Sequence, residues 1–264
     1  MKRYFENKNY WALILGGSSG MGLATAKKLA AEGMHLILLY RDPKITEAPF
    51  LTAMEELKSS TAVQIKTYNS NALQKETIET VCSEVLSFAG KGSIKTMLHS
   101  IARGNLKMLA PGSNQLTADD FANTLHAMGY NIFEWASILL QKNLFAQNAT
   151  VTALTSEGNQ RSWPGYAAVG AAKSALENIC RSMAAELAPH GIRTNIIQAG
   201  TTETPSFNAI PGHEIIKKEA IKRNPFKRLT TAEDVANAVY LLCTDEASWI
   251  NGALLHVDGG EHCC

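Results

Sequence analysis

Tyr166 and Lys173 are the two side chains whose types and spacing could do chemistry together. They lie seven residues apart, close to two helical turns, so a helix through this segment would carry both on one face. A phenol hydroxyl can donate a hydrogen bond to an oxygen that gains negative charge, and a neighbouring ammonium group favours the ionised form of that phenol. Because a tyrosine and a lysine at this spacing also occur by chance, the surrounding elements decide whether the pair is an active site.

A glycine-rich turn between two apolar runs is the second feature that points to function. Residues 11–15 are apolar over a length typical of a strand buried on both faces, and residues 35–40 form a similar run. Between them lie the turn at 16–22 and a segment at 23–32 that is typical of a helix. Strand, glycine turn, helix and strand are the first unit of a dinucleotide-binding fold, in which the backbone approaches a pyrophosphate at the helix N-terminus.

The alternation of strands and helices continues to the end of the chain. Further strands are expected at 63–68, 94–99, 149–154, 193–198 and 253–257, and further helices at 77–88, 119–141, 166–188 and 232–243. This pattern predicts an α/β fold: one doubly wound Rossmann domain over residues 1–264, with a parallel sheet of about seven strands and helices on both faces. Ligands of such sheets bind at the carboxyl ends of the strands, so we expect function in the segments that follow strands one, four, five and six.

Composition agrees with a cytoplasmic enzyme of one domain. The chain has 264 residues, 45% of them hydrophobic, and a net charge of +1, which gives no global indication of a nucleic acid or membrane partner. No stretch approaches the ~20 apolar residues of a membrane span. The five cysteines are scattered without metal-like spacing, so we expect reduced thiols and no metal site.

Several motifs occur in an order that resembles the short-chain dehydrogenase/reductase family. They are Gly16-x3-Gly20-x-Gly22, the Tyr166/Lys173 pair, Asn195-x4-Gly200-x3-Thr204, Arg228-x5-Asp234 and Val257-Asp-Gly-Gly260. The resemblance extends from about residue 10 to about residue 260. It implies a nicotinamide cofactor, hydride transfer and a homotetramer or homodimer.

Departures from the common family pattern indicate a subfamily. Most members have a tyrosine four residues before the lysine, where this chain has Val169, and an asparagine near Met128 or Gly129, where we see no replacement. His99-Ser100-Ile101 after strand four, the seven-residue spacing, and Gln198-Ala199-Gly200 together resemble the enoyl-acyl-carrier-protein reductases of fatty acid biosynthesis. That subfamily reduces the double bond of a 2-enoyl thioester. Many of its members carry a second tyrosine where this chain has Ser156, a position at which ketone-reducing members keep a serine.

The resemblance implies a role for each catalytic candidate. The Tyr166 hydroxyl would donate a hydrogen bond to the enolate oxygen that forms when hydride reaches the β-carbon. Lys173 would hold the nicotinamide ribose and favour the ionised phenol. Ser156 either adds a second donor or satisfies a backbone group.

The cofactor contacts are placed by motif. The candidates are Gly16, Ser18, Ser19, Gly20, Met21, Gly22, Arg41, Asn71, Ser100, Ile101, Lys173, Ala199, Gly200 and Thr204. Arg41 follows strand two and could pair with a 2′-phosphate, so NADPH is favoured, although the adjacent Asp42 leaves NADH possible.

The substrate segment is expected at 204–225. Its basic residues either attract an acyl carrier protein or the phosphates of coenzyme A, or form a solvated helix face. Phe207 and Ile210 line an acyl pocket or simply pack, and His99 is expected to be structural. Two other functions remain open: a ketone-reducing enzyme, and a non-catalytic nucleotide-binding protein on the same scaffold.

Overall fold

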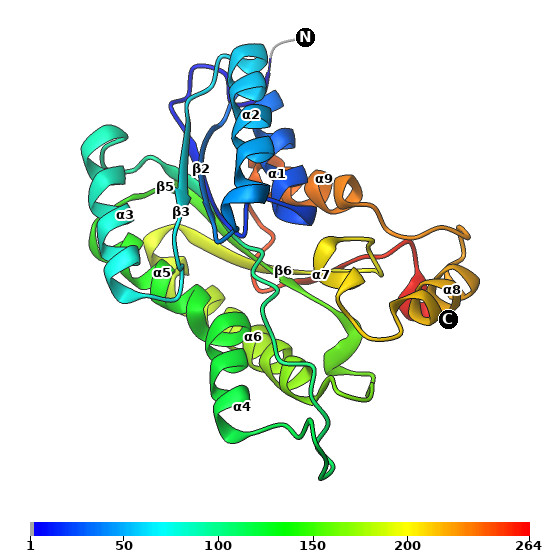
Figure 1. The fold of residues 1–264 in the computed structure, drawn as a ribbon. Helices are drawn as coiled ribbons and strands as arrows, with labels where there is room; N and C mark the ends of the chain where they lie inside the picture. The colour runs from blue at the N-terminus through cyan, green and yellow to red at the C-terminus, as the bar shows by residue number, and fades with distance from the viewer. Residues whose placement is uncertain (1–2) are drawn as a thin grey trace.

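The computed structural model describes residues 3–264, whose seven strands form one parallel sheet in the order β3-β2-β1-β4-β5-β6-β7 (Figure 1). The strands are β1 (Trp11–Leu15), β2 (His35–Tyr40), β3 (Ile65–Asn69), β4 (Ile94–His99), β5 (Phe145–Thr155), β6 (Ile192–Ala199) and β7 (Leu254–Val257). The order reverses between β1 and β4, which opens a crevice at their carboxyl ends. The predicted doubly wound α/β fold is therefore confirmed.

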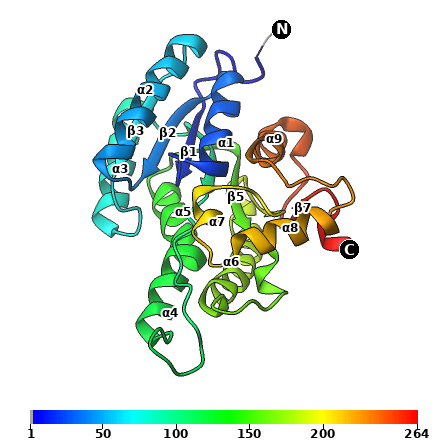
Figure 2. The same ribbon diagram turned by 45° about the vertical axis from the view of Figure 1, so that its right-hand side comes forward.

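Helices cover both faces of the sheet (Figures 1 and 2). The main helices are α1 (Gly20–Ala31), α2 (Lys44–Thr61), α3 (Lys75–Phe88), α4 (Ala118–Leu125), α5 (Asn131–Gln141), α6 (Ala167–Glu186), α7 (Pro205–Asn208), α8 (His213–Arg223) and α9 (Ala232–Cys243). The apolar side chains of α3, α5 and α6 pack on one face, and those of α1, α2 and α9 pack on the other. Among residues 3–264, no helix is both long and apolar enough to cross a membrane.

Strand β1 shows why the central strands are apolar throughout. Trp11, Leu13 and Leu15 belong to the core on the α3, α5 and α6 side. Ala12 and Ile14 belong to the core on the α1 and α9 side. Because successive side chains of a strand point to opposite faces, a strand covered on both sides buries every residue. Packing on both faces of the sheet therefore holds the strands, and with them the strand ends at the candidate site, in a fixed position.

Three segments differ from the sequence prediction. Helix α2 was not predicted, because only Phe50 and Met54 are buried along it and Pro49 lies within it, so it has little apolar periodicity. The single helix expected at 119–141 is interrupted by a π-helical turn at His126–Tyr130, which separates α4 from α5. A π turn inserts one residue into a helix and often occurs at functional sites. The segment expected as a loop at 204–225 contains α7 and α8.

Candidate active site

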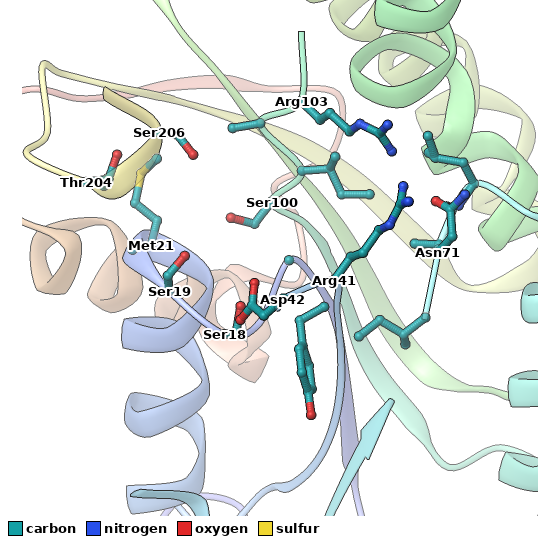
Figure 3. A pocket seen from close by; sticks show the side chains of 18 of the residues that line it. Ser18, Ser19, Met21, Arg41, Asp42, Asn71, Ser100, Arg103, Thr204 and Ser206 are labelled. Atoms are coloured by element: carbon teal, nitrogen blue, oxygen red, sulfur yellow. The ribbon is translucent and has the colours of Figure 1, made fainter. Parts of the chain in front are cut away.

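A cleft of about 480 Å³ lies at the carboxyl ends of β1, β2 and β4 (Figure 3). Its lining includes ten of the residues predicted to contact a cofactor. They are Gly16, Ser18, Ser19, Gly20, Met21, Arg41, Asn71, Ser100, Ile101 and Thr204. The structure thus brings together residues from five separate segments of the chain at the switch point of the sheet.

The glycine turn borders this cleft, and larger residues would not fit at its glycine positions. A Cβ at Gly16 would lie 2.5 Å from the Ser100 carbonyl oxygen, and a Cβ at Gly22 would lie 2.0 Å from the Gly16 carbonyl oxygen. Gly20 has a φ of +52° and would place a Cβ 3.1 Å from Thr204 Cγ2. Gly22 does not line the cleft, so its role is to let α1 pack against the turn.

The N-terminus of α1 opens into the cleft and suits an anion. Ser19 is the N-cap residue, yet its side chain makes no capping hydrogen bond, and the first turn of α1 contains no acidic residue. Ser18 and Met21 line the cleft beside it. Backbone N–H groups at the positive end of a helix bind phosphates. The residues present therefore fit the pyrophosphate of a dinucleotide.

Two arginines line one side of the cleft. Arg41 follows β2, and Arg103, which the sequence analysis missed, follows β4. Figure 3 shows both guanidinium groups on the side of the cleft where Asn71 lies. Asp42 is the only acidic residue among those that line the cleft. Its backbone is held by Asn69, whose Oδ1 accepts from the Asp42 N–H at 3.1 Å and whose Nδ2 donates to the Asp42 carbonyl at 2.9 Å.

One face of α6 presents a polar strip to the end of β5. The Lys173 ammonium donates to the Leu154 carbonyl at 2.7 Å, and Lys173 is only 6% exposed, so it is not a surface lysine. One turn later, Glu177 Oε1 accepts from Thr155 Oγ1 at 2.8 Å. Burial lowers the pKa of Lys173 to about 8. The strand end therefore holds the lysine in place, while burial weakens its affinity for a proton.

Tyr166 is the N-cap residue of α6 and packs tightly on the turn after β5. A Cβ at Gly158 would lie 2.2 Å from Tyr166 Cε1, so only glycine leaves room for the phenol ring. Burial raises the pKa of Tyr166, and the Ser156 hydroxyl partly opposes this shift. Lys173 is not among the causes of this shift, so its effect on the ionised phenol stays a prediction. Among residues 3–264, the Ser156 hydroxyl has no partner with ordinary hydrogen-bond geometry.

Val169 lies in a small apolar cluster and leaves no room for a second phenol. It is 3% exposed and packs with Met128 and Ala172. Tyr166 and Ile101 are partly buried against the same cluster. Ile101 also lines the cleft, so the apolar cluster borders both the cleft and Tyr166.

His99, at the end of β4, and Asn131, at the start of α5, are fully buried polar residues. Burial is the main cause that lowers the pKa of His99 to about 3, and the charge of Lys173 adds to the effect. His99 therefore stays neutral near pH 7, and its structural role stays a prediction. Asn131 follows the π turn, is fully buried, and donates to the Ala72 carbonyl at 3.1 Å. No asparagine stands at Met128 or Gly129, and Asn131 follows directly after the π turn.

Some predicted residues do not line the cleft. These are Gly22, Ser156, Tyr166, Lys173, Ala199 and Gly200. Gly200 is a packing glycine, because a Cβ there would lie 2.4 Å from Thr230 Oγ1 and 2.9 Å from the Asp258 backbone. The candidate site consequently has two parts: a cofactor cleft along β1, β2 and β4, and a Tyr166–Lys173 face beside β5.

The basic residues of α8 are partly paired. Lys217 donates to Glu203 at 2.8 Å, and Arg223 donates to Glu157 at 2.6 Å and also contacts Glu261. Two of the four basic side chains on this helix already have acidic partners. This pairing favours a solvated helix face over a surface that binds an acyl carrier protein or coenzyme A. Phe207 is half-buried, with its ring edge-on to His213 at 6.0 Å between centroids.

Comparison with known proteins gives a consistent result. A family model described as Enoyl-(Acyl carrier protein) reductase matches residues 16–262. The enoyl-acyl-carrier-protein reductase (NADH) of Aquifex aeolicus (strain VF5) is 28% identical over 257 residues, covering 95% of this chain and 90% of that protein. A crystal structure of the A. aeolicus VF5 enoyl-acyl-carrier-protein reductase (NADH) has a TM-score of 0.83 at 27% identity, covering 99% of this chain and 98% of that one.

Two further relatives show the range of reactions and cofactors. The enoyl-acyl-carrier-protein reductase (NADPH) of Staphylococcus aureus (strain MRSA252) is 27% identical over 259 residues, covering 97% of each chain. The 3-oxoacyl-acyl-carrier-protein reductase of Escherichia coli (strain K12) is 26% identical over 258 residues, covering 98% of each chain. Similar identity to double-bond and ketone reductases, and to NADH and NADPH enzymes, leaves reaction and cofactor to be argued from the residues.

Proposed function

We propose that this chain, which belongs to the short-chain dehydrogenase/reductase family, reduces the 2,3 double bond of an enoyl thioester with a reduced nicotinamide cofactor. The observation that carries the proposal is the position of the phenol. Tyr166, seven residues before Lys173, reaches the turn after β5, whereas the position four residues before the lysine is filled by buried Val169. A ketone-reducing member of the family would use a tyrosine at the second position.

The residues of the cleft fit the cofactor, and each has a separable task. A bound reduced nicotinamide supplies the hydride. The N-terminus of α1 holds the pyrophosphate through its N–H groups. Lys173, anchored on the Leu154 carbonyl, still has N–H groups to donate to a ribose hydroxyl, and its pKa of about 8 leaves it mainly protonated at pH 7.

Tyr166 then acts on the substrate as a protonated phenol. Burial raises its pKa, so the hydroxyl keeps its proton at physiological pH. A neutral phenol stabilises a developing enolate oxygen by donating a hydrogen bond. This charge state suits a double-bond reductase, in which the thioester oxygen gains charge when hydride arrives at the β-carbon.

Ketone reduction is the second candidate, and one observation favours it. The Ser156 hydroxyl lies beside Tyr166 and lacks a partner of ordinary geometry among residues 3–264. A free hydroxyl there could donate to a carbonyl oxygen of a 3-oxoacyl thioester. The same group could equally support the enolate, so the substrate has to be tested directly.

The decisive experiment compares crotonyl and acetoacetyl thioesters, with oxidation of NADPH or NADH followed at 340 nm. The proposal expects turnover of the crotonyl thioester, and loss of at least about 100-fold in kcat for Tyr166→Phe with cofactor affinity unchanged. Tyr240→Phe, on α9, is the matched control and should retain full activity. Turnover of the acetoacetyl thioester alone would refute the proposal, as would full activity of Tyr166→Phe. Cofactor binding without any turnover would favour the non-catalytic alternative.

We also propose NADPH as the preferred cofactor. Arg41 and Arg103 lie on one side of the cleft, opposed by Asp42 alone among the residues that line it. Two guanidinium groups near each other repel unless an anion lies between them, and a 2′-phosphate is an anion of suitable charge. Docking of an acyl carrier protein on α8 remains a weaker proposal because Lys217 and Arg223 are already paired.

A further inference from the structure

A cluster of two histidines and one aspartate lies at the C-terminal end of the chain, apart from the cofactor cleft. His256 is in β7, Asp258 follows that strand, and His262 lies four residues further on. One possible ligand atom from each residue lies within 4.8 Å of the other two. Gly259 and Gly260, with φ of +61° and +81°, reverse the backbone between them and bring His262 back over His256.

The carboxylate of this cluster is held in a fixed position. Asp258 is 4% exposed, and its Oδ1 accepts from the Gly260 N–H at 2.9 Å. Its Oδ2 accepts from the His262 N–H at 3.0 Å and lies 2.6 Å from His262 Nδ1. The aspartate is therefore a preorganised oxygen ligand.

The two imidazoles are exposed and stacked. Their centroids lie 3.7 Å apart with 13° between the ring planes. A neutral imidazole offers one nitrogen lone pair to a metal ion. The parallel rings do not yet direct both lone pairs at one point. Because χ2 of histidine is a soft torsion, turning one exposed ring achieves this at low cost.

We infer that His256, Asp258 and His262 bind a divalent transition-metal ion of the zinc class. Two imidazole nitrogens and one carboxylate oxygen are ligands that Zn²⁺ accepts, with water completing the coordination. Cys263 Sγ lies 3.2 Å from His262 Nε2, on the opposite edge of the ring from Asp258, so the thiol is not a ligand in this arrangement. The sequence analysis expected no metal because it considered cysteine spacing and not the His-x-Asp-x3-His pattern.

The bound ion would connect β7 to a turn that supports the substrate segment. Asn224, directly after α8, donates to the Asp258 carbonyl at 2.8 Å. Glu261, in the same turn, contacts Arg223 and accepts from the Thr201 hydroxyl at 3.1 Å. A cation that fixes this turn therefore stabilises the contacts around α8. This inference does not depend on the proposed reaction.

The test is titration with Zn²⁺ by calorimetry, and with Co²⁺ by visible absorption, on full-length Cys263→Ser/Cys264→Ser protein. This double variant removes the exposed terminal thiols, which would bind either ion by themselves. We expect one ion per chain, with affinity falling at least tenfold in His256→Ala and in His262→Ala. His190→Ala, a change at an exposed histidine outside the cluster, should bind as the parent does.

Three results would overturn the inference. One is the absence of saturable binding in the double variant, and another is binding that both histidine variants retain at full affinity. The third is an equal loss in His190→Ala. Both variant sites are exposed, so the variants are expected to fold, and circular dichroism would check this.

Discussion

Replacing Lys173 by methionine should remove activity and, at the same time, stabilise the protein at neutral pH. The ammonium group is buried with a carbonyl as its hydrogen-bond partner, and burial lowers the lysine pKa from 10.5 to about 8. A shift of this size corresponds to about 3 kcal/mol of destabilisation when the folded protein carries the charge at pH 7. Loss of the hydrogen bond to the Leu154 carbonyl costs about 1 kcal/mol, so the variant should be more stable than wild type by about 2 kcal/mol.

The pH dependence gives the sharper test. Between pH 8 and 10.5 the unfolded lysine is protonated while the folded one has lost its proton, so the unfolded state binds more protons and wild-type stability rises with pH. The methionine variant lacks this titration. Its advantage in the free energy of unfolding should therefore shrink by about 2 kcal/mol from pH 7 to pH 10.

Urea unfolding of both proteins at pH 7, 8, 9 and 10 measures this difference. Lys91→Met, a change at an exposed lysine, controls for the loss of one positive charge. A difference between Lys173→Met and wild type that stays constant over this range would refute the assignment of a lowered pKa. A variant that is less stable at pH 7 would show that the Leu154 contact outweighs the cost of burying the charge.

Three further changes test other parts of the structure. Gly158→Ala places a Cβ 2.2 Å from the Tyr166 ring, so kcat should fall at least about tenfold with cofactor affinity unchanged, whereas Gly112→Ala, where nothing lies within 4 Å, should have no effect. Arg41→Ala should raise the KM for NADPH far more than the KM for NADH, and equal increases would contradict the proposed 2′-phosphate contact. Thr231→Ala removes the capping box of α9 and should lower the free energy of unfolding by about 1 kcal/mol in urea titrations; an unchanged midpoint would count against it.

The central strands and the glycine turn could be predicted because local sequence alone determines them. Residues 11–15 and 35–40 are apolar without interruption, and the structure has strands at these same residues. Helix α2 could not be predicted in this way, since its stability comes from two buried side chains on an otherwise polar surface. The π turn at His126–Tyr130 depends on packing against α6, which no local pattern records.

The candidate site was predictable to the extent that motifs fix backbone positions. Gly16, Gly20 and the residues that follow β2, β3 and β4 line one cleft, whereas Gly22 does not. Arg103 was missed because it stands outside any motif. The pKa of Tyr166 could not be predicted, because the sequence does not show the burial that raises it.

The hydrogen bond between Lys173 and the Leu154 carbonyl fixes the position of the lysine, whereas the sequence position of the tyrosine differs between members of the family. The lysine is set by the main chain of β5, whatever side chain carries the phenol. Moving the phenol from position 166 to position 169 is nevertheless blocked in this chain. Gly104 would already place a Cβ 2.5 Å from Val169 Cγ2, so the three-residue-shorter spacing could be installed only by rebuilding the loop above it. Changing the tyrosine–lysine spacing from seven residues to four therefore requires space for a phenol at position 169, and does not require any charged group to move.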